Sequence, residues 1–192
     1  MAQKAIAVVI CSTRPNRINP FVAKHVLDVF EAVAQTGESP KVELIDLADQ
    51  NLPLYDEPEV PGDLPEDDPT PHYVHAYTRA WSTLVKRYDA FVFVTPQYNW
   101  SIPASLKNAL DYLFFEWRGK PAGIVTYGNR GGVKAAPHLR QILTGLRMGQ
   151  VAEPTVALRS LMGPLAEIET TMKEGWRKEG EGMRALWLCL GT

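Results

Sequence analysis

Short apolar runs alternate with stretches of helical periodicity along this chain, and the alternation constrains the fold more than any other feature. The apolar runs lie at residues 5–11, 41–47, 90–95, 121–127 and 151–158. Segments with apolar residues at helical spacing follow the first four runs, at residues 20–34, 74–88, 103–117 and 135–146. Strands that alternate with helices predict a parallel sheet with helices on both faces and right-handed crossovers.

The resulting prediction is an α/β fold, a single-domain flavodoxin-like three-layer sandwich. Its five-stranded parallel sheet should have the order 2-1-3-4-5. A length of 192 residues fits one domain, with a core at about 4–160 and a helical tail at about 163–192. The stretch 51–71 holds six prolines and many acids. We expect a long surface loop there, because too little chain precedes it to form a separate domain.

Charge and cysteine content exclude several classes of function. The formal net charge is −2, so no broad positive field attracts nucleic acid or anionic lipid. The two cysteines, Cys11 and Cys189, form no CxxC and no zinc-binding spacing with histidine, which indicates a reducing compartment and no structural metal. The apolar run at 5–11 is too short for a signal peptide or a membrane span. A cytoplasmic protein without a membrane partner is expected.

In a sheet of this order, ligands bind beyond the carboxyl ends of the strands, at the switch point between the first and third. The loop after the first strand, residues 12–19, carries hydroxyl, guanidinium and amide groups just before a helix. Free N–H groups and the helix dipole make such an end suitable for a phosphate, and Arg14 adds a charge-assisted contact. The alternative is a capped, solvated turn. Neither a Walker A motif nor a GxGxxG fingerprint follows this strand.

The loops after the third and fourth strands would form the other walls of the same site. Pro96 and Pro103 restrict the second loop, so its amides and rings can face a flat heterocycle. The alternative is that its aromatic residues only cap the edge of the sheet. The third loop, residues 127–132, contains three glycines that allow the backbone to approach a ligand closely.

The second loop also carries a specific resemblance. The pattern P-x-Y-N-x-S-x-P-x-x-L-K-N-A-x-D-Y, from Pro96 to Tyr112, resembles the signature of the NADPH-dependent FMN reductase family. The S-T-R at 12–14 and Y-G-N-R-G-G at 127–132 are similar to other loops of that family. The resemblance implies a flavodoxin-like fold, bound FMN, and NADPH or NADH as co-substrate. Known members include quinone, azo-dye and chromate reductases.

The resemblance also implies a set of cofactor-binding residues. The phosphate end would be held by Ser12, Arg14, Asn19, Pro20 and Phe21, the ring by Pro96, Gln97, Tyr98, Asn99 and Trp100, and the rim by Tyr127, Gly128, Arg130 and Gly131. Two positions depart from the family pattern, since many members carry Gly at the position of Cys11 and Glu at that of Gln97. The first departure predicts that the strand ends without a positive φ. The second removes a negative charge beside the flavin.

Segment 103–117 has apolar residues on two faces of its expected helix, including Tyr112 and Phe115. One face of this helix would pack against the sheet. The other face would contact a second copy of the chain, which would give a homodimer or a tetramer. The resemblance implies dimers as well. The alternative is that loop 51–71 folds over Tyr112 and Phe115.

The expected function is an FMN-dependent oxidoreductase that takes hydride from NAD(P)H and reduces quinones or other flat small-molecule acceptors by a ping-pong mechanism. The cofactor carries the chemistry, so no side chain is expected to act as acid or nucleophile. Two alternatives are a non-catalytic FMN-binding electron carrier or sensor, and a reductase that uses FMN as a diffusible substrate. His72, His75 and His138 are expected at the surface, Cys11 is expected to be inert, and the acids of 56–68 are expected to be solvated.

Overall fold

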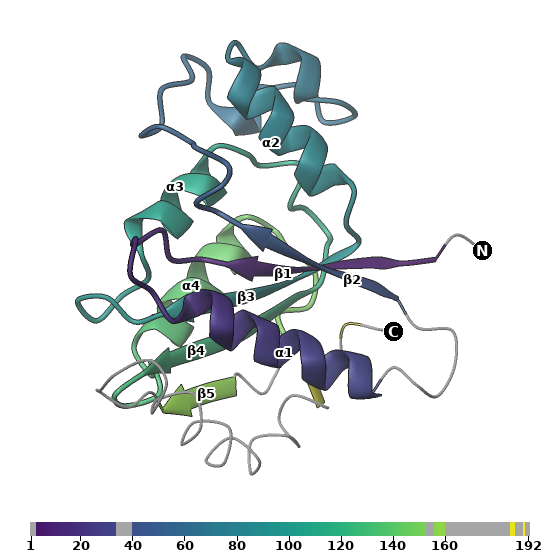
Figure 1. Ribbon diagram of the computed structural model, residues 1–192. Coiled ribbons are helices and arrows are strands. Elements are labelled where there is room, and N and C mark those ends of the chain that lie inside the picture. Colours follow the sequence, from purple (N-terminus) through teal and green to yellow (C-terminus); the bar gives the residue numbers. More distant parts are fainter. Residues whose placement is uncertain (1–2, 34–39, 153–155, 160–184, 187–189, 191–192) are drawn as a thin grey trace.

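A parallel sheet forms the centre of the molecule (Figure 1). The computed structural model describes residues 3–33, 40–152, 156–159, 185–186 and 190. Within these residues the strands are β1 (Ala5–Ile10), β2 (Lys41–Asp46), β3 (Ala90–Pro96), β4 (Ala122–Gly128) and β5 (Val156–Arg159). The sheet has the order β2-β1-β3-β4-β5 and every neighbouring pair is parallel, which confirms the predicted topology.

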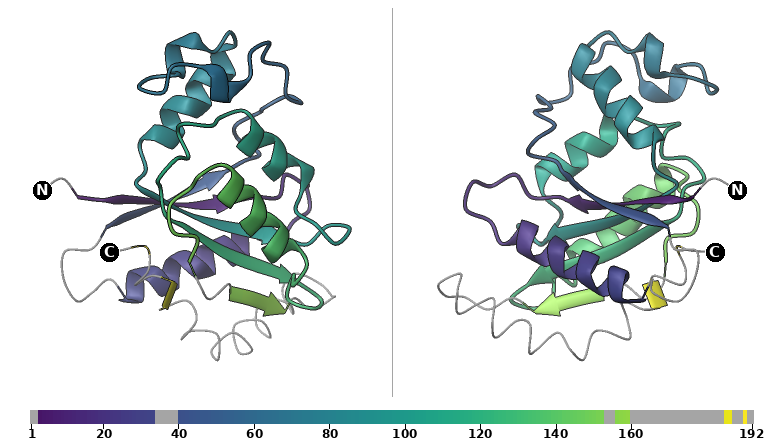
Figure 2. Two further views of the ribbon diagram at one scale, coloured as in Figure 1. Left: turned by 180° about the vertical axis from the view of Figure 1, so that it is seen from behind. Right: turned by 45° about the vertical axis from the view of Figure 1, so that its right-hand side comes forward.

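The sheet is buried on both faces because helices cover it from both sides. Helix α1 (Asn19–Val33) lies on one face. Helices α2 (Ala76–Lys86), α3 (Ala104–Asp111) and α4 (Ala135–Gly145) lie on the other, as Figures 1 and 2 show. Every residue of β3 is buried, which explains why this central strand has an almost continuous apolar sequence instead of an alternating one. Its residues alternate between the two cores, with Val92 facing α1 and Phe93 facing the other helices.

Segment 103–117 differs from its prediction. Helix α3 ends at Asp111, and residues 112–117 continue as turns instead of a helix. The Tyr112 hydroxyl bonds to the carbonyl of Pro53 at 3.2 Å and to Asp56 Oδ1 at 2.9 Å. Loop 51–71 therefore covers Tyr112 within one chain, as the alternative expectation stated. The phenol group is the physical reason, since a buried hydroxyl needs hydrogen-bond partners and this loop supplies them.

The segment before α2 also corrects two expectations. Val74 was placed on the buried stripe of a helix, but it precedes α2 and is 58% exposed, whereas its neighbour Tyr73 is buried. Glu57 was placed on a solvated acidic face, but it is only 7% exposed. Its carboxylate accepts hydrogen bonds from the backbone N–H groups of Val74 and His75, at 2.8 and 3.0 Å. A buried carboxylate with such donors stabilises the start of α2.

The last part of the chain is described only in pieces. Strand β5 was predicted from residue 151, but Val151 forms an isolated bridge to Ala122 and the strand is assigned from Val156. The expected tail helix at 165–176 lies outside the described residues. Leu186 and Leu190 are buried in the core beside α1. Across the described part of the chain, every helix is too short or too polar to cross a bilayer.

Candidate functional site

One pocket lies where the loops after β1, β3 and β4 meet. Its volume is about 720 Å³, and its lining residues are Arg14, Pro96, Gln97, Tyr98, Asn99, Trp100, Tyr127, Gly128, Asn129, Arg130 and Gly132. The sequence prediction named all of these except Asn129 and Gly132. The strand order places the pocket at the carboxyl ends of the strands, near the switch point between β1 and β3. Of the predicted residues, Ser12, Asn19, Pro20, Phe21 and Gly131 do not line it.

Asn19 anchors the first loop to the sheet. Its side chain is fully buried, Oδ1 accepts from the Ser12 backbone N–H at 2.7 Å, and Nδ2 donates to the Val94 carbonyl at 3.0 Å. Both ends of the Asn19 amide are therefore bonded to backbone groups. In this arrangement the Asn19 side chain holds the loop to the sheet and does not line the pocket. Pro20 is partly buried in the first turn of α1, and Phe21 packs against the core on that side. These residues position the loop.

The two arginines of the first loop differ in whether they are free to bind an anionic ligand. Arg17 is largely buried, donates to the Ser12 carbonyl at 2.7 Å and forms an ion pair with Asp46. Arg14 is exposed, lines the pocket, and lies with its guanidinium carbon 4.2 Å from the centre of the Tyr98 ring. Among the described carboxylates, none forms an ion pair with Arg14. Arg14 is thus the cation of this loop that is available to an anionic ligand.

The second loop makes a tight turn with a strained backbone. Asn99 and Trp100 have φ angles of 48° and 66°, and Tyr98 and Ser101 exchange two backbone hydrogen bonds of 2.9 Å each. Positive φ at a bulky residue such as Trp costs roughly 1–2 kcal/mol and requires surrounding support. The turn presents the Trp100 ring at the mouth of the pocket, where it is 72% exposed.

Hydrogen bonds from the second loop to the first loop and to the start of α4 support the strained turn. Tyr98 bonds through its hydroxyl to Ser12 Oγ at 2.7 Å, which joins the second loop to the first. Gln97 Oε1 accepts from the Lys134 backbone N–H at 2.8 Å, and Ser101 Oγ lies 2.6 Å from His138 Nδ1. The second loop is therefore fixed to the start of α4 at two points. His138 is exposed, as expected. Its bond to Ser101 could not be predicted from the sequence, because the two residues are 37 positions apart and belong to no shared motif.

The glycines of the third loop let the chain fold back on β4. Gly131 and Gly132 have φ angles of 72° and 73°. A Cβ at Gly132 would lie 2.7 Å from the Thr126 Cβ, which is closer than real contacts allow, and Thr126 Oγ1 donates to the Gly131 carbonyl at 2.7 Å. The glycines were expected to let the backbone approach a ligand closely. In the structure, the close approach at Gly132 is to Thr126 of β4. This fold places Gly128, Asn129 and Arg130 on the wall of the pocket.

Among the described residues, the charged groups of the pocket wall are both basic. Arg14 and Arg130 line it, and no Asp or Glu of the described part of the chain does. Burial raises the pKa of the Tyr127 phenol and of the Cys11 thiol, so both stay protonated. Cys11 directly follows β1 and has no positive φ, as predicted from the departure at this position. The described residues contain no group of His, Cys, Asp and Glu that could hold a metal ion. The pocket suits an organic anion with a flat part.

Sequence comparison identifies related proteins. The profile of the family described as NADPH-dependent FMN reductase matches residues 5–161. The NAD(P)H-dependent FMN reductase LOT6 of Saccharomyces cerevisiae is 37% identical over 165 residues, which cover 84% of this chain and 85% of that protein. A quinone reductase of Escherichia coli K12 is 31% identical over 147 residues, covering 73% of this chain and 70% of that protein.

Solved structures with a similar fold include two flavoenzymes. The NAD(P)H:(acceptor) oxidoreductase FerB of Paracoccus denitrificans has a TM-score of 0.67 at 23% identity, and the match covers 97% of both chains. An FMN-dependent NADH-azoreductase of Bacillus anthracis, solved in complex with FMN, has a TM-score of 0.59 at 14% identity, over 96% of this chain and 100% of that one. These matches agree with the flavodoxin-like architecture. From the profile match and the identity to curated relatives, this chain belongs to the NADPH-dependent FMN reductase family.

Proposed function

We propose that this protein is an FMN-dependent oxidoreductase that takes hydride from NAD(P)H and reduces quinones or other flat small-molecule acceptors. The observation that carries the proposal is the pocket itself. Loops after β1, β3 and β4 enclose one space at the switch point, and the charged groups among the described residues of its wall are cations. The activities of the related FMN and quinone reductases support the same conclusion.

The residues present fit FMN. The pocket volume lies within the range of about 300–1,000 Å³ that is usual for cofactor sites. Arg14 and the backbone N–H groups before α1 offer donors for the phosphate, while Ser12, Asn19, Pro20 and Phe21 hold that loop in place. Pro96, Gln97, Tyr98 and Asn99 would face the ring, with Tyr127, Gly128, Arg130 and Gly131 near its rim. Bound FMN would supply the two-electron chemistry that no side chain of this pocket provides.

We propose that the nicotinamide and the acceptor use the same space in turn. The walls come from three loops of one chain, and Trp100 borders the remaining opening. Hydride transfer needs its donor within about 3–3.5 Å of the acceptor atom, a position that two ligands cannot share. This reasoning supports ping-pong kinetics, in which NAD(P)⁺ leaves before the acceptor enters.

The cofactor is predicted to be FMN at one molecule per chain. One loop supplies the phosphate donors, and no dinucleotide fingerprint follows β1 to take the second phosphate of FAD. The purified protein should be denatured and the released flavin identified and counted by chromatography, after reconstitution with a mixture of FMN and FAD. Recovery of FAD, or failure of the protein to retain either flavin, would contradict the prediction.

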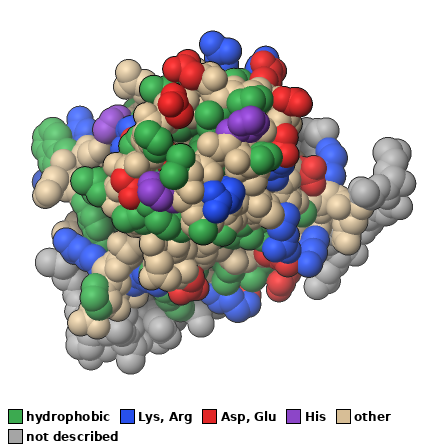
Figure 3. Space-filling view, turned by 90° about the horizontal axis from the view of Figure 1, so that it is seen from above, with side chains coloured by type: hydrophobic (Ala, Val, Ile, Leu, Met, Phe, Trp, Pro, Cys, Tyr) green, Lys and Arg blue, Asp and Glu red, His purple; other side chains and the backbone are tan. Residues whose placement is uncertain are grey.

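We further propose that the described residues form a single FMN-binding domain and that the protein is a cytoplasmic homodimer or tetramer. The interface would include Phe114 and Phe115, which follow α3, stay partly exposed and pack edge to face at 5.2 Å. Leu54, Val60 and Val74 are exposed in the segment between β2 and α2. Figure 3 shows hydrophobic side chains among charged ones on the face seen from above.

Phe115→Glu is expected to weaken self-association, because burying an unpaired charge at an interface costs more than the roughly 2–7 kcal/mol of an unpaired neutral polar group. Sedimentation equilibrium should show a wild-type dimer at micromolar concentration and a population shifted to monomer in the variant. Phe115→Leu is the matched control, since it keeps an apolar side chain and should remain a dimer. A wild-type protein that sediments as a monomer would rule out the proposed interface.

A further inference from the structure

The loop after β4 and the start of α4 carry two cations, Arg130 and Lys134, in addition to the Arg14 that is proposed to bind the FMN phosphate. Residues 117–152 contain six Lys and Arg residues and no Asp or Glu, although acids outnumber bases in the whole chain, 22 to 20. Arg130 lines the pocket, and Lys134 lies at the N-terminal boundary of α4. Among the described carboxylates, none forms an ion pair with either cation. Arg14 on the opposite loop already provides a cation for FMN.

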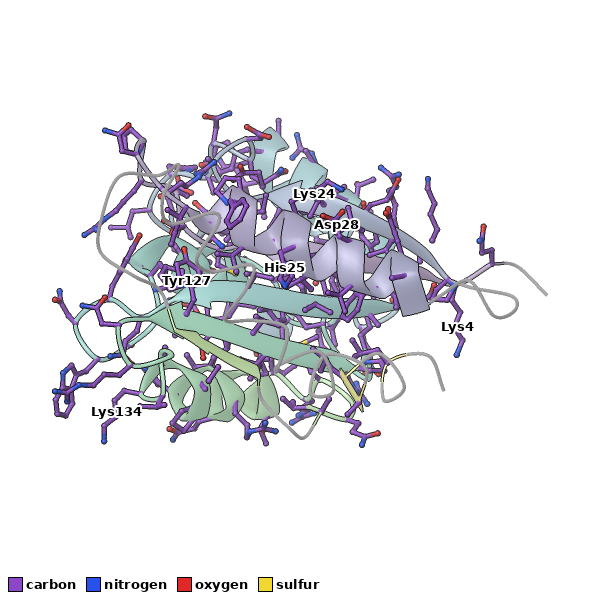
Figure 4. All side chains as sticks on the ribbon, turned by 60° about the horizontal axis from the view of Figure 1, so that its bottom comes forward. Lys4, Lys24, His25, Asp28, Tyr127 and Lys134 are labelled. Atoms are coloured by element: carbon purple, nitrogen blue, oxygen red, sulfur yellow. The ribbon has the colours of Figure 1, made fainter. Side chains whose placement is uncertain are left out.

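Lys134 is held beside the exposed indole of Trp100. Its ammonium nitrogen lies 5.1 Å from the centre of the Trp100 ring. Its backbone N–H donates to the side-chain oxygen of Gln97, three residues before that tryptophan, so a second contact joins Lys134 to the loop that carries Trp100. Figure 4 shows the Lys134 side chain pointing outward at the edge of the molecule. The mouth of the pocket therefore combines a flat aromatic face with a cation that forms no ion pair with any carboxylate the structure describes.

Building on the proposed function, we propose that Trp100 and Lys134, assisted by Arg130, bind the 2′-phosphoadenosine end of NADPH and make the protein prefer NADPH to NADH. An adenine can stack on the exposed indole, as bases do on aromatic side chains. The phosphate that distinguishes NADPH is attached to the ribose next to that adenine. Because Lys134 lies over one face of the indole, the adenine would stack on the other face, and a charge-assisted contact between Lys134 and the 2′-phosphate would strengthen binding.

Two other ligand groups explain the arrangement less well. A quinone is neutral, so hydrogen bonds from Arg130 and Lys134 to its carbonyl oxygens are weaker than the same bonds to an anionic phosphate. The pyrophosphate is common to NADH and NADPH and lies between the two nucleoside halves, away from the adenine ring. The proposal therefore commits to the 2′-phosphate, and the experiment must separate it from the pyrophosphate.

Calorimetry with two adenosine nucleotides makes this separation without relying on turnover. FMN-reconstituted wild type should bind adenosine 2′,5′-bisphosphate at least about tenfold more tightly than adenosine 5′-diphosphate, which lacks the 2′-phosphate. Lys134→Ala should remove this difference, and Lys134→Arg should retain most of it. Lys24→Ala is the matched control: it removes one exposed cation from α1, far from Lys134 in Figure 4, and should behave as wild type.

Steady-state kinetics should show the same pattern. In Lys134→Ala, kcat/KM for NADPH should fall about tenfold while kcat/KM for NADH stays within about twofold. Truncation leaves the backbone bond to Gln97 intact, so the fold of the loop is preserved. Equal losses for both nucleotides, or equal affinity of wild type for both adenosine nucleotides, would overturn this inference while leaving the proposed function standing. Absence of turnover with either nucleotide in the FMN-loaded wild type would instead refute the proposed function.

Discussion

Replacing Arg14 with alanine should weaken FMN binding about 10- to 100-fold, because one charge-assisted hydrogen bond contributes roughly 1.5–3 kcal/mol. Arg14 is the basic residue of the first loop that lines the pocket and stays free of a carboxylate among the described residues. Arg17, three residues further, is engaged with Ser12 and Asp46. The dissociation constant should be measured by quenching of flavin fluorescence when the flavin-free protein is titrated.

Riboflavin provides the internal control for this prediction. It lacks the phosphate, so wild type and Arg14→Ala should bind it with similar affinity. Arg14→Lys keeps a charge but loses the planar fork of donors, and its affinity for FMN should fall between the other two. An unchanged FMN dissociation constant in Arg14→Ala would show that the phosphate lies elsewhere. An equal loss of riboflavin binding would mean that Arg14 acts through its contact with the Tyr98 ring instead.

Asn19→Ala should lower the free energy of unfolding by about 1–3 kcal/mol, because it removes hydrogen bonds to two buried backbone groups and leaves one of them, the Ser12 N–H, without a partner, whereas the Val94 carbonyl still accepts from the Cys11 N–H at 3.2 Å. These groups are the N–H of Ser12 and the carbonyl of Val94, which Asn19 joins at 2.7 and 3.0 Å. The loss should appear as a lower urea midpoint in the flavin-free protein. FMN binding should weaken too, since the loop that carries Arg14 would no longer be fixed to β3.

Asn16→Ala is the matched control for that measurement. Asn16 lies in the same loop but is exposed, so its truncation should change stability by no more than about 0.5 kcal/mol. Equal stability of Asn19→Ala and Asn16→Ala would contradict the anchoring role of Asn19.

The strands and their order were predictable because each central strand must be apolar along its whole length. In β3 the residues pack alternately against α1 and against α3 and its neighbours, so a continuous apolar run is the only pattern that suits both faces. The end of α3 was not predictable in the same way. Apolar residues continue to Trp117 at helical spacing, but the hydroxyl of Tyr112 finds partners in loop 51–71, and such a long-range bond leaves no periodic signal.

The residues that line the pocket could be predicted where the family pattern covers them. Pro96 to Trp100 line the pocket, and their contact with a flavin ring stays a prediction. The roles of residues that position a loop, without lining the pocket themselves, were harder to predict. The family resemblance implied that Asn19 lies at the phosphate end, and the structure shows that its amide holds the loop to β3. His138 gave no signal at all, because its bond to Ser101 joins residues 37 positions apart.

The most direct test of the proposed function is an anaerobic titration of the FMN-reconstituted protein followed by visible absorbance. NADPH alone should bleach the flavin absorbance and release NADP⁺ before any acceptor is present, and a quinone added afterwards should restore the spectrum. Each half of the reaction should proceed without the other ligand, since both use the same pocket in turn. A spectrum that NADPH leaves unchanged, or that responds only when NADPH and quinone are present together, would contradict the account.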